Sequence, residues 1–589
     1  RSCLKIELTI NPDFQWDREI HGSTEPFWIF VEDCDGEKIL YYEYFTLKHK
    51  HIGLKEYIFE FIVPLFDPLH PLYYIRVVSD RWLQCETVVP IYFKNIILPE
   101  KFPPLTELLD LKLLPISSLK WPEVEQQLKH FPTFNAIQTQ VFTTLYGSDG
   151  NVFLGASTGS GKTLCGLLAI LRCLKQKRES KIVYVAPLES VCKQKRKEIS
   201  QYLKNVKVSI GELTGQPSID SKIMETCDII FSIPEYWDTF SRRWKQRKVM
   251  KLIRLVIVDE LHLLGESGSV LEVITSRMRY IAIQLNQEIR LVGLATSIAN
   301  SRDIAEWIGA APDHCFNFHP NVRPVPLEIY IQGFDQTQRA VRLNAMGKHI
   351  YRGIKQHSMG KPVMVFVSDR KQARITALDL VAMAGADNEP KRFLHISSEE
   401  MTKYISKAQE RILRHCLEYG VGYIYEGMDD RDRDLVEKLF ESGAVQLLVS
   451  TYRLCWELSQ QSHMVVVMDT QRYDGQERRY IDYTIPDMLQ MLGKAGRSLI
   501  DDGAKCLIYT HTPKKEFYKK FLYDPFPVES HLNHFFADHL NAEVVAKTIE
   551  NKQDCIDYLT WTLFYRRLFQ NPNYYNLQGV TGTIINDYL

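Results

Sequence analysis

The sequence predicts an α/β protein with two parallel sheets in tandem, preceded by a β-rich region and followed by a helical one. Two series of short apolar strands alternate with helical stretches, and strands buried in parallel sheets have this composition. The first series is NVFLGA, KIVYVAP, CDIIFSIP, RLVIVDE and IRLVGLAT, and the second is KPVMVFVSD, VGYIYEG, VQLLVST, MVVVMDT and AKCLIYT. Because 589 residues exceed what one hydrophobic core usually supports, we expect several domains.

Residues 1–97 predict a small antiparallel β-sandwich. KIELTI and YYIRVVSD alternate apolar and polar residues, and a DG turn separates two apolar runs between them. Cys34 and Cys85 could pair as a disulfide between sheets, but we expect two buried free thiols. The chain opens inside a strand without an initiator Met, so we also expect it to be a piece of a longer protein.

The remaining boundaries follow changes in composition. Residues 98–125 are rich in Pro and Leu, which suits an extended linker packed on a surface. The two α/β domains are expected at residues 126–315 and 316–520. The helical region at residues 521–589 completes the predicted organisation.

The composition excludes several classes of protein. The formal net charge is zero, so a basic surface over the whole protein is absent and any contact with nucleic acid must be local. No apolar run reaches the length of a membrane span, and no signal-peptide pattern opens the chain. Twelve cysteines occur singly without a C-x-x-C pair, which indicates free thiols in a reducing compartment.

The strongest motif is ASTGSGKT at residues 156–163, which follows the strand NVFLG and opens the helix TLCGLLAILRCL. A glycine-rich turn at a helix N-terminus directs backbone N–H groups at a phosphate, so a chance Gly-Ser turn is a poor alternative. Lys162 would reach the β- and γ-phosphates of a nucleotide, and Thr163 would hold Mg²⁺. The predicted nucleotide-binding residues of this loop are Thr158, Gly159, Ser160, Gly161, Lys162 and Thr163.

A second motif, LVIVDELH at residues 255–262, ends a buried strand with adjacent carboxylates. Asp259 would bind Mg²⁺ through water, and Glu260 would orient the attacking water, although a surface acidic pair is the alternative. His262 completes the candidate catalytic residues of this motif. Upstream, Gln138 in FNAIQTQ fits a glutamine that reads adenine.

A third motif, QMLGKAGR at residues 490–497, resembles Q-x-x-G-R-x-G-R, the last signature of superfamily-2 helicases. Arg497 remains as a candidate arginine finger. Lys494 stands where the signature has an earlier arginine. Arginine presents a rigid fork to phosphate oxygens and lysine a flexible point charge, so the charge is kept and the geometry is lost. Both residues are candidate catalytic residues.

With these motifs the chain resembles the ratchet-type DExH-box RNA helicases, specifically the spliceosomal members that carry two helicase cassettes in tandem. Further matching stretches are STEPFW (23–28), SRRWKQRK (241–248), VLEVITSRMRYI (270–281), RPVPLEI (323–329), FLYDPFPVESHL (521–532) and QNPNYYNLQGV (570–580). The resemblance implies two RecA-like P-loop domains, preceded by the immunoglobulin-like end of an N-terminal cassette and followed by a truncated winged-helix region. It points to the second, C-terminal cassette.

Several residues depart from the pattern of active family members. Ala295 replaces the first hydroxyl of S-A-T, Tyr425 replaces a histidine, Glu457 replaces a glycine and Ser459 replaces Asn or Asp. We expect the Glu457 carboxylate to lie near phosphate oxygens, where two charges ~5 Å apart at an effective dielectric near 20 repel by roughly 3 kcal/mol. The alternative is that Glu457 turns harmlessly into solvent.

The resemblance implies a cassette that binds ATP or ADP with Mg²⁺ on Lys162, Thr163, Asp259 and Gln138 but hydrolyses ATP poorly. It would regulate a neighbouring cassette that unwinds the U4/U6 duplex, and would offer a protein-docking surface. The implied partners are that N-terminal cassette and other U5 snRNP and spliceosomal proteins in the nucleus. Contact with snRNA is expected mainly through the parent protein. The alternatives are an active RNA-stimulated ATPase and a scaffold that has lost its nucleotide.

Overall fold

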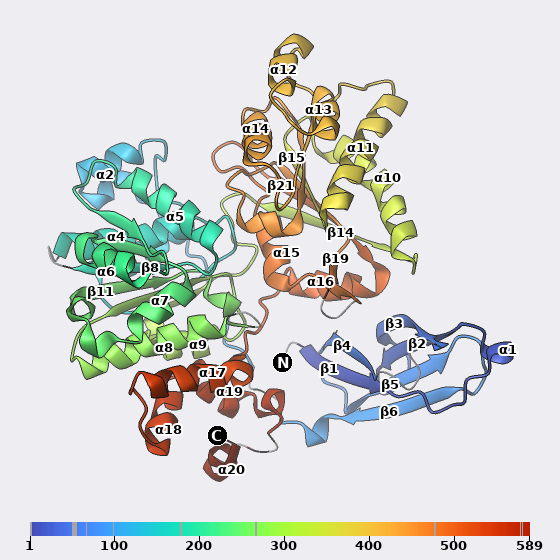
Figure 1. Ribbon diagram of the computed structural model, residues 1–589, viewed down its shortest axis with the longest axis horizontal. Helices are drawn as coiled ribbons and strands as arrows, with labels where there is room; N and C mark the ends of the chain where they lie inside the picture. The colour runs from blue at the N-terminus through green and yellow to red at the C-terminus, as the bar shows by residue number, and fades with distance from the viewer. Residues whose placement is uncertain are drawn as a thin grey trace.

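The computed structural model describes residues 3–588 except 50–55, 66–67, 98, 100, 177–179, 266–267, 476–478, 578 and 580. Two α/β units lie side by side in Figure 1, the first in cyan and green and the second in yellow and orange. The N-terminal strands (blue) lie below the second unit, and the C-terminal helices (red) lie below the first. We call residues 136–317 the first unit and residues 327–521 the second unit.

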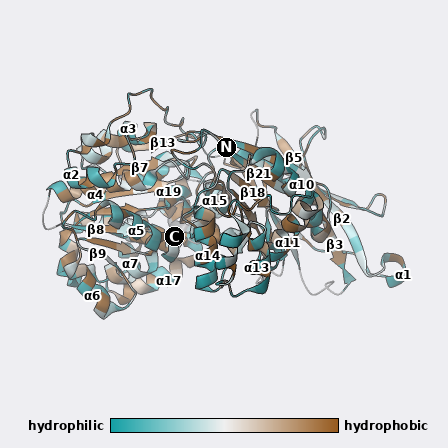
Figure 2. Ribbon diagram, turned by 90° about the horizontal axis from the view of Figure 1, so that it is seen from above, coloured by the Kyte–Doolittle hydropathy of each residue, from teal (hydrophilic) through white to brown (hydrophobic). Residues whose placement is uncertain are grey.

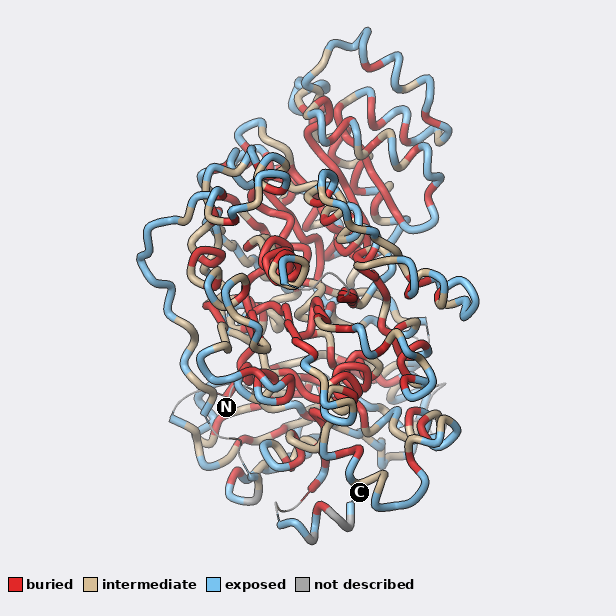
Figure 3. The backbone as a smooth tube through the Cα atoms, turned by 90° about the vertical axis from the view of Figure 1, so that its left-hand side faces the viewer, coloured by how far each residue is buried: buried red, intermediate tan, exposed pale blue. Residues whose placement is uncertain are grey.

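The first unit is built on a parallel sheet in the order β13-β7-β12-β11-β8-β10-β9. Its strands are β7 (Val152–Gly155), β8 (Lys181–Val185), β9 (Ile210–Glu212), β10 (Ile229–Ser232), β11 (Ile253–Val258), β12 (Arg290–Ala295) and β13 (Cys315–Asn317). Every residue of β7 and β8 is buried, as the red core of Figure 3 shows, because helices cover both faces of the sheet. The sheet continues to Asn317, so the expected boundary at residue 315 falls inside β13.

The second unit repeats this plan with a parallel sheet in the order β14-β21-β18-β15-β17-β16. Its strands are β14 (Leu327–Phe334), β15 (Val363–Val367), β16 (Val421–Ile424), β17 (Leu447–Thr451), β18 (Met464–Met468) and β21 (Ala504–His511). The predicted pair of parallel α/β sheets is therefore confirmed. An antiparallel hairpin, β19 (Gln471–Asp474) and β20 (Arg479–Asp482), projects from this unit.

Helices flank both sheets, and the hydrophilic faces of α13 and α14 point outward in Figure 2. In and before the first unit they are α2 (Pro122–Gln127), α3 (Ala136–Phe142), α4 (Lys162–Gln176), α5 (Glu189–Tyr202), α6 (Pro217–Thr226), α7 (Pro234–Ser241), α8 (Ser269–Gln284) and α9 (Ser301–Ile308). In the second unit they are α10 (Arg339–His357), α11 (Arg370–Ala386), α12 (Ser398–Ile405), α13 (Arg411–Glu418), α14 (Asp430–Glu441), α15 (Ile485–Leu492) and α16 (Lys515–Phe521). None of the helices in the described part of the chain has the length and apolarity needed to span a membrane.

The N-terminal region forms two antiparallel sheets, as expected for a sandwich. β1 (Cys3–Ile10) pairs with β4 (Tyr57–Pro64), and the other sheet has the order β3 (Ile39–Lys48), β2 (Thr24–Glu32), β5 (Leu72–Ser79), β6 (Glu86–Tyr92), with the short α1 (Arg18–His21) before β2. The rings of Tyr41 and Phe61 stack between the sheets with centroids 4.3 Å apart. This aromatic contact joins β3 to β4 across the core.

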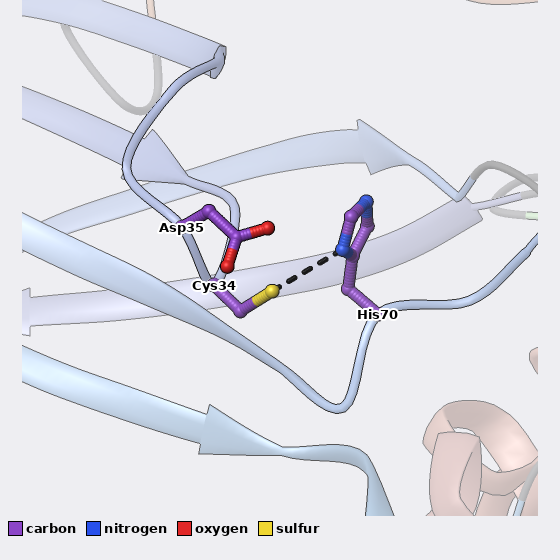
Figure 4. A group of neighbouring side chains, drawn as sticks. All are labelled: Cys34, Asp35 and His70. Carbon is purple, nitrogen blue, oxygen red and sulfur yellow. Dashed lines mark hydrogen bonds between the residues drawn. The ribbon is translucent and has the colours of Figure 1, made fainter.

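The expectation that Cys34 and Cys85 are buried is wrong, although both are free thiols. Cys85 is exposed because it precedes the edge strand β6, most of which faces solvent. Cys34 is half-buried on a loop, and its Sγ lies 3.2 Å from Nδ1 of His70, beside Asp35 (Figure 4). A pairing of Cys34 with Cys85 has no place in this arrangement.

The sandwich is anchored on the second unit through lysines. Lys514 Nζ lies 2.9 Å from Asp482 and donates a hydrogen bond to the Tyr41 hydroxyl at 3.2 Å. Lys520 Nζ donates to the Leu65 carbonyl at 2.8 Å. Of the linker expected at residues 98–125, residues 107–114 have no regular structure and Thr106 pairs with Phe318 at the edge of the first sheet. Its last part is helical instead, with a 3-10 turn at Ile116–Leu119 and the start of α2.

The C-terminal helices pack on α8 of the first unit. They are α17 (Leu532–Val545), α18 (Lys552–Thr560), α19 (Leu563–Gln570) and α20 (Gly582–Tyr588). Arg277 of α8 lies 2.7 Å from Asp238 and 2.5 Å from Glu543, and all three side chains are buried. Glu272 accepts hydrogen bonds from the Ser530 hydroxyl at 2.6 Å and from Phe564 N–H at 2.7 Å. Polar contacts therefore fix this helical region on the first unit.

This contact is expected to depend on pH. Burial raises the pKa of Glu272 from 4.5 to about 7, against the opposing effect of its hydrogen-bond donors. Between these two pKa values the unfolded chain releases the Glu272 proton and the folded protein keeps it. The free energy of unfolding therefore falls as pH rises through this range, by on the order of 3 kcal/mol. We expect amide hydrogen exchange in 532–570 to accelerate as pH rises through this window, after correction for the intrinsic pH dependence of exchange. Glu272→Gln should remove the dependence, and an unchanged slope in that variant would contradict it.

Candidate functional site

The loop at residues 156–161 joins β7 to α4 and has the geometry of a phosphate cradle. Gly159 and Gly161 have φ of +85° and +88°, a region that favours glycine. A Cβ on Gly161 would lie 2.4 Å from Nε2 of Gln138. A side chain at position 161 would therefore have to displace Gln138. Ser160 Oγ is buried and has no hydrogen-bond partner among the described residues. Such a hydroxyl is costly unless a ligand oxygen satisfies it, and it lies where the phosphate is predicted.

Helix α3 holds this loop from the other side. Asn135 caps the helix, and the Gln138 side chain returns a hydrogen bond by accepting from Asn135 N–H at 3.0 Å. Gln138 Nε2 donates to the Gly161 carbonyl at 3.2 Å, and Asn135 Nδ2 donates to the Ser160 carbonyl at 2.9 Å. The structure therefore brings Gln138 to the predicted loop through a capping box, in which a glutamine at the third helical position is favoured.

The DELH residues lie at the same edge of the first sheet, after β11. Asp259 Oδ2 accepts a hydrogen bond from the Tyr184 hydroxyl at 2.6 Å. Glu260 adopts a left-handed conformation with φ of +51°, and its buried Oε2 makes no hydrogen bond with the described residues. His262 Nδ1 lies 3.6 Å from Glu260 Oε2 and accepts from Thr296 N–H at 3.3 Å. Burial, together with Lys162, lowers the pKa of His262 to about 3, so the ring is neutral.

Lysines converge on these carboxylates. Lys162 Nζ donates to the carbonyls of Ala156 at 2.8 Å and Ser157 at 3.2 Å. Burial lowers the pKa of Lys162, and the neighbouring Glu260 and Asp259 oppose that shift. Its ammonium is thus held at the mouth of the loop that it was predicted to complete.

Lys195 of α5 was missed by sequence reasoning. Its Nζ donates to Thr163 Oγ1 at 2.5 Å and lies 3.8 Å from Asp259 Oδ2. Burial opposes the charge, but Asp259 and other carboxylates outweigh it and raise the pKa of Lys195, so the ammonium is charged. The helical period could have indicated that Lys195 faces the core, because residue 195 falls on the same helix face as the buried Val191, Cys192 and Ile199. The surrounding Lys and Arg residues suggest a solvated helix face instead.

The third motif approaches the loop from the second unit. Gly493 follows α15, and a Cβ there would lie 2.3 Å from Cγ2 of Thr158. Lys494 is buried, and its Nζ donates to the Leu458 carbonyl at 2.5 Å. Burial lowers the pKa of Lys494 to about 8, with Lys195 repelling it and Glu260 attracting it. Lys494 therefore lies close enough to the first unit for the charges of Lys195 and Glu260 to act on it.

Arg497 forms an ion pair with a carboxylate of its own unit. Its Nε and Nη2 each lie 2.9 Å from an oxygen of Asp501, in a bidentate pair. Asp501 also lies 3.2 Å from Lys361 Nζ. The guanidinium fork that would serve as an arginine finger is therefore committed within the second unit in this conformation.

The expectation that Glu457 faces the nucleotide is not supported by its contacts. Its Oε2 lies 2.8 Å from Arg433 Nη1 of α14, and 35% of its side chain is exposed. Tyr425 likewise lies among charged residues of the second unit, accepting from Arg374 Nη2 at 2.9 Å and donating to Glu410 at 3.2 Å. Ala295 ends β12, and its carbonyl accepts from Ala156 N–H at 3.0 Å. Ala295 therefore touches the phosphate loop directly, whereas Glu457 and Tyr425 contact charged residues of the second unit.

Three parts of the chain match known families. Residues 135–304 match the DEAD/DEAH box helicase family, residues 529–589 a winged helix-turn-helix domain, and residues 1–92 the Sec63 Brl domain. These matches agree with the predicted P-loop unit and with the predicted winged-helix region.

Relatives match along the whole chain. The chain is 52% identical over 592 residues to the U5 small nuclear ribonucleoprotein 200 kDa helicase of Homo sapiens and 48% identical over 591 residues to that of Drosophila melanogaster. It is 46% identical over 597 residues to activating signal cointegrator 1 complex subunit 3 of Danio rerio. It spans 28% of the length of the first two and 39% of the third. The resemblance to spliceosomal DExH-box helicases is confirmed.

A solved structure supports the fold. The structure titled DUF1998 helicase MrfA bound to DNA and AMPPNP superposes with a TM-score of 0.55 at 15% identity, covering 79% of this chain and 62% of that one. At this identity the likeness shows the arrangement of the α/β units and nothing about ligands.

The glycine at position 161 provides a test of the cradle. Gly161→Ala would place a methyl group against Gln138 at a positive φ, at an expected cost of about 1–3 kcal/mol. We expect the thermal unfolding midpoint to fall and nucleotide binding to be lost. Gly147→Ala is the matched control, because its Cβ meets only Thr143 Cγ2 at an ordinary 3.6 Å. Equal behaviour of the two variants would show that the loop does not need this glycine.

Proposed function

Residues 135–304 belong to the DEAD/DEAH box helicase family, and from this premise we propose that the chain is a nucleotide-binding helicase cassette that hydrolyses ATP poorly. One observation carries the proposal. The binding side of the site is assembled, with Lys162, Asp259 and Glu260 together at one edge of the sheet, whereas the groups expected to stabilise the transferring phosphate are engaged elsewhere.

The residues proposed to bind the nucleotide all belong to the first unit. Backbone N–H groups of residues 158–163 and the Lys162 ammonium would hold the phosphates of ATP or ADP, and Gln138 would read the base. Thr163 and Asp259 carry the oxygen donors that Mg²⁺ prefers. When bound there, Mg²⁺ would neutralise phosphate charge.

The two groups expected to stabilise the transferring phosphate, Lys494 and Arg497, both have other partners. Lys494 donates to the Leu458 carbonyl and offers one point charge in place of a fork. Arg497 is held by both oxygens of Asp501. Loss of an arginine finger costs about 10³–10⁵ in rate in related phosphoryl-transfer enzymes, which is the order of defect that we expect if Arg497 stays with Asp501.

The relatives extend the proposal to the parent protein. We propose that the chain is the C-terminal cassette of a spliceosomal RNA helicase that unwinds the U4/U6 duplex in the nucleus, with 1–97 closing the preceding cassette and 521–589 starting a winged helix. It would regulate the neighbouring cassette and dock other U5 snRNP proteins. The match of this whole chain to 28% of the length of U5 small nuclear ribonucleoprotein 200 kDa helicases supports this.

An active RNA-stimulated ATPase is the second candidate. It is favoured by the complete P-loop and by Glu260. The buried Oε2 of Glu260 makes no hydrogen bond with any described residue and is suited to orient a water molecule. Closure of the two units on nucleotide and RNA would have to release Arg497 from Asp501.

Binding and turnover separate the candidates. We expect a fluorescent ATP analogue to bind the protein, and Lys162→Ala to abolish binding, because the ammonium faces the phosphates. Phosphate release with RNA should stay within ~10-fold of the rate without it, a barrier change of no more than about 1.4 kcal/mol. Stimulation far above that level would establish the active ATPase instead.

A further inference from the structure

Lys195 lies where the oxygen donors for Mg²⁺ come together. Its ammonium contacts Thr163 Oγ1 at 2.5 Å and lies 3.8 Å from Asp259 Oδ2, which are the two side chains predicted to hold the metal. Only 16% of the Lys195 side chain and 1% of the Asp259 side chain are exposed. This buried ion pair is part of the nucleotide site and is unlike the surface lysines of the same helix.

The surroundings fix Lys195 in this place. α5 presents its buried face to the first sheet through Val191, Cys192 and Ile199. Tyr184 donates to the same Asp259 oxygen at 2.6 Å, which orients the carboxylate. Thr163 and Asp259 fit Mg²⁺ by donor type, but the cation that they contact belongs to the chain itself.

We propose that Lys195 is a tethered cation that takes over the role of Mg²⁺ at the nucleotide phosphates, so that nucleotide binding depends little on a divalent metal. This inference rests on the proposed nucleotide binding. An ammonium has three donors. With one directed at Thr163 and one at Asp259, the third remains for a phosphate oxygen.

The charges at the site agree with this assignment. Lys195 lies close enough to Lys162 and to Lys494 to oppose the charge of each, and Glu260 attracts all three ammonium groups. Asp259, Glu198 and Glu260 together stabilise the Lys195 ammonium, so the site already holds a cation matched to its carboxylates. Mg²⁺ entering beside Lys195 would meet a charge of its own sign, which disfavours its binding. A single positive charge would also polarise the phosphates less than Mg²⁺, in keeping with poor hydrolysis.

The test compares nucleotide affinity with and without metal. A fluorescent ADP is titrated into the protein in EDTA and in saturating MgCl₂. We expect the Kd to change by ~3-fold or less in the unmodified protein. In Lys195→Gln we expect EDTA to weaken binding by ~10-fold or more relative to MgCl₂, equivalent to ~1.4 kcal/mol, because metal must then supply the charge. Lys193→Gln is the matched control, since Lys193 is exposed on the same helix and pairs with Glu189.

The outcomes are distinct. A Kd that rises ~10-fold or more in EDTA for the unmodified protein overturns the inference, as does equal metal dependence of Lys195→Gln and Lys193→Gln. If Lys195→Gln fails to fold, the unmodified protein alone decides. Nucleotide binding that needs no metal and is abolished by Lys162→Ala supports the inference. Nucleotide binding that needs metal rejects it. Absence of Lys162-dependent binding in both solutions would reject the proposed nucleotide site itself.

Discussion

Buried lysine ammonium groups facing two carboxylates at the edge of the first sheet are the interaction on which the site depends. Parallel strands bring the loop after β7 and the carboxylates after β11 to one edge, so the charges of Asp259 and Glu260 act on Lys162. The second unit adds Lys494 and packs Gly493 on Thr158. The close approach at Gly493 leaves no room for a side chain. Charge balance and backbone contact therefore join the two units at the phosphate loop.

The same geometry explains why individual substitutions have unequal weight. Glu457 carries a charge that the family pattern lacks, yet Arg433 neutralises it at 2.8 Å. Lys494 keeps the charge of the arginine that it replaces, yet burial lowers its pKa to about 8. Arg497 is the residue that the pattern expects, and Asp501 holds its fork. The weak hydrolysis that we propose thus depends more on which partners the charged groups have than on which residues are present.

The predictable features are those that depend on local pattern. Apolar strand runs predicted both parallel sheets, and the glycines of ASTGSGKT predicted a loop that needs positive φ at Gly159 and Gly161. Gln138 was predicted to read adenine, whereas its capping role, which depends on Asn135, was not recognised. Lys195, Glu457 and Cys85 were misjudged because their surroundings come from residues distant in sequence or from an exposed sheet edge. Sequence pattern indicates which face a side chain occupies, but the charge that it meets there depends on tertiary packing.

We propose that this cassette holds ATP and hydrolyses it poorly. The decisive measurement is the identity of the nucleotide retained by the protein after incubation with ATP and RNA, removal of free nucleotide and denaturation, followed by chromatography. The account predicts that bound ATP is recovered intact and that Lys162→Ala retains none. Recovery of ADP, with phosphate released in proportion to the protein present, would show a working motor and contradict the account.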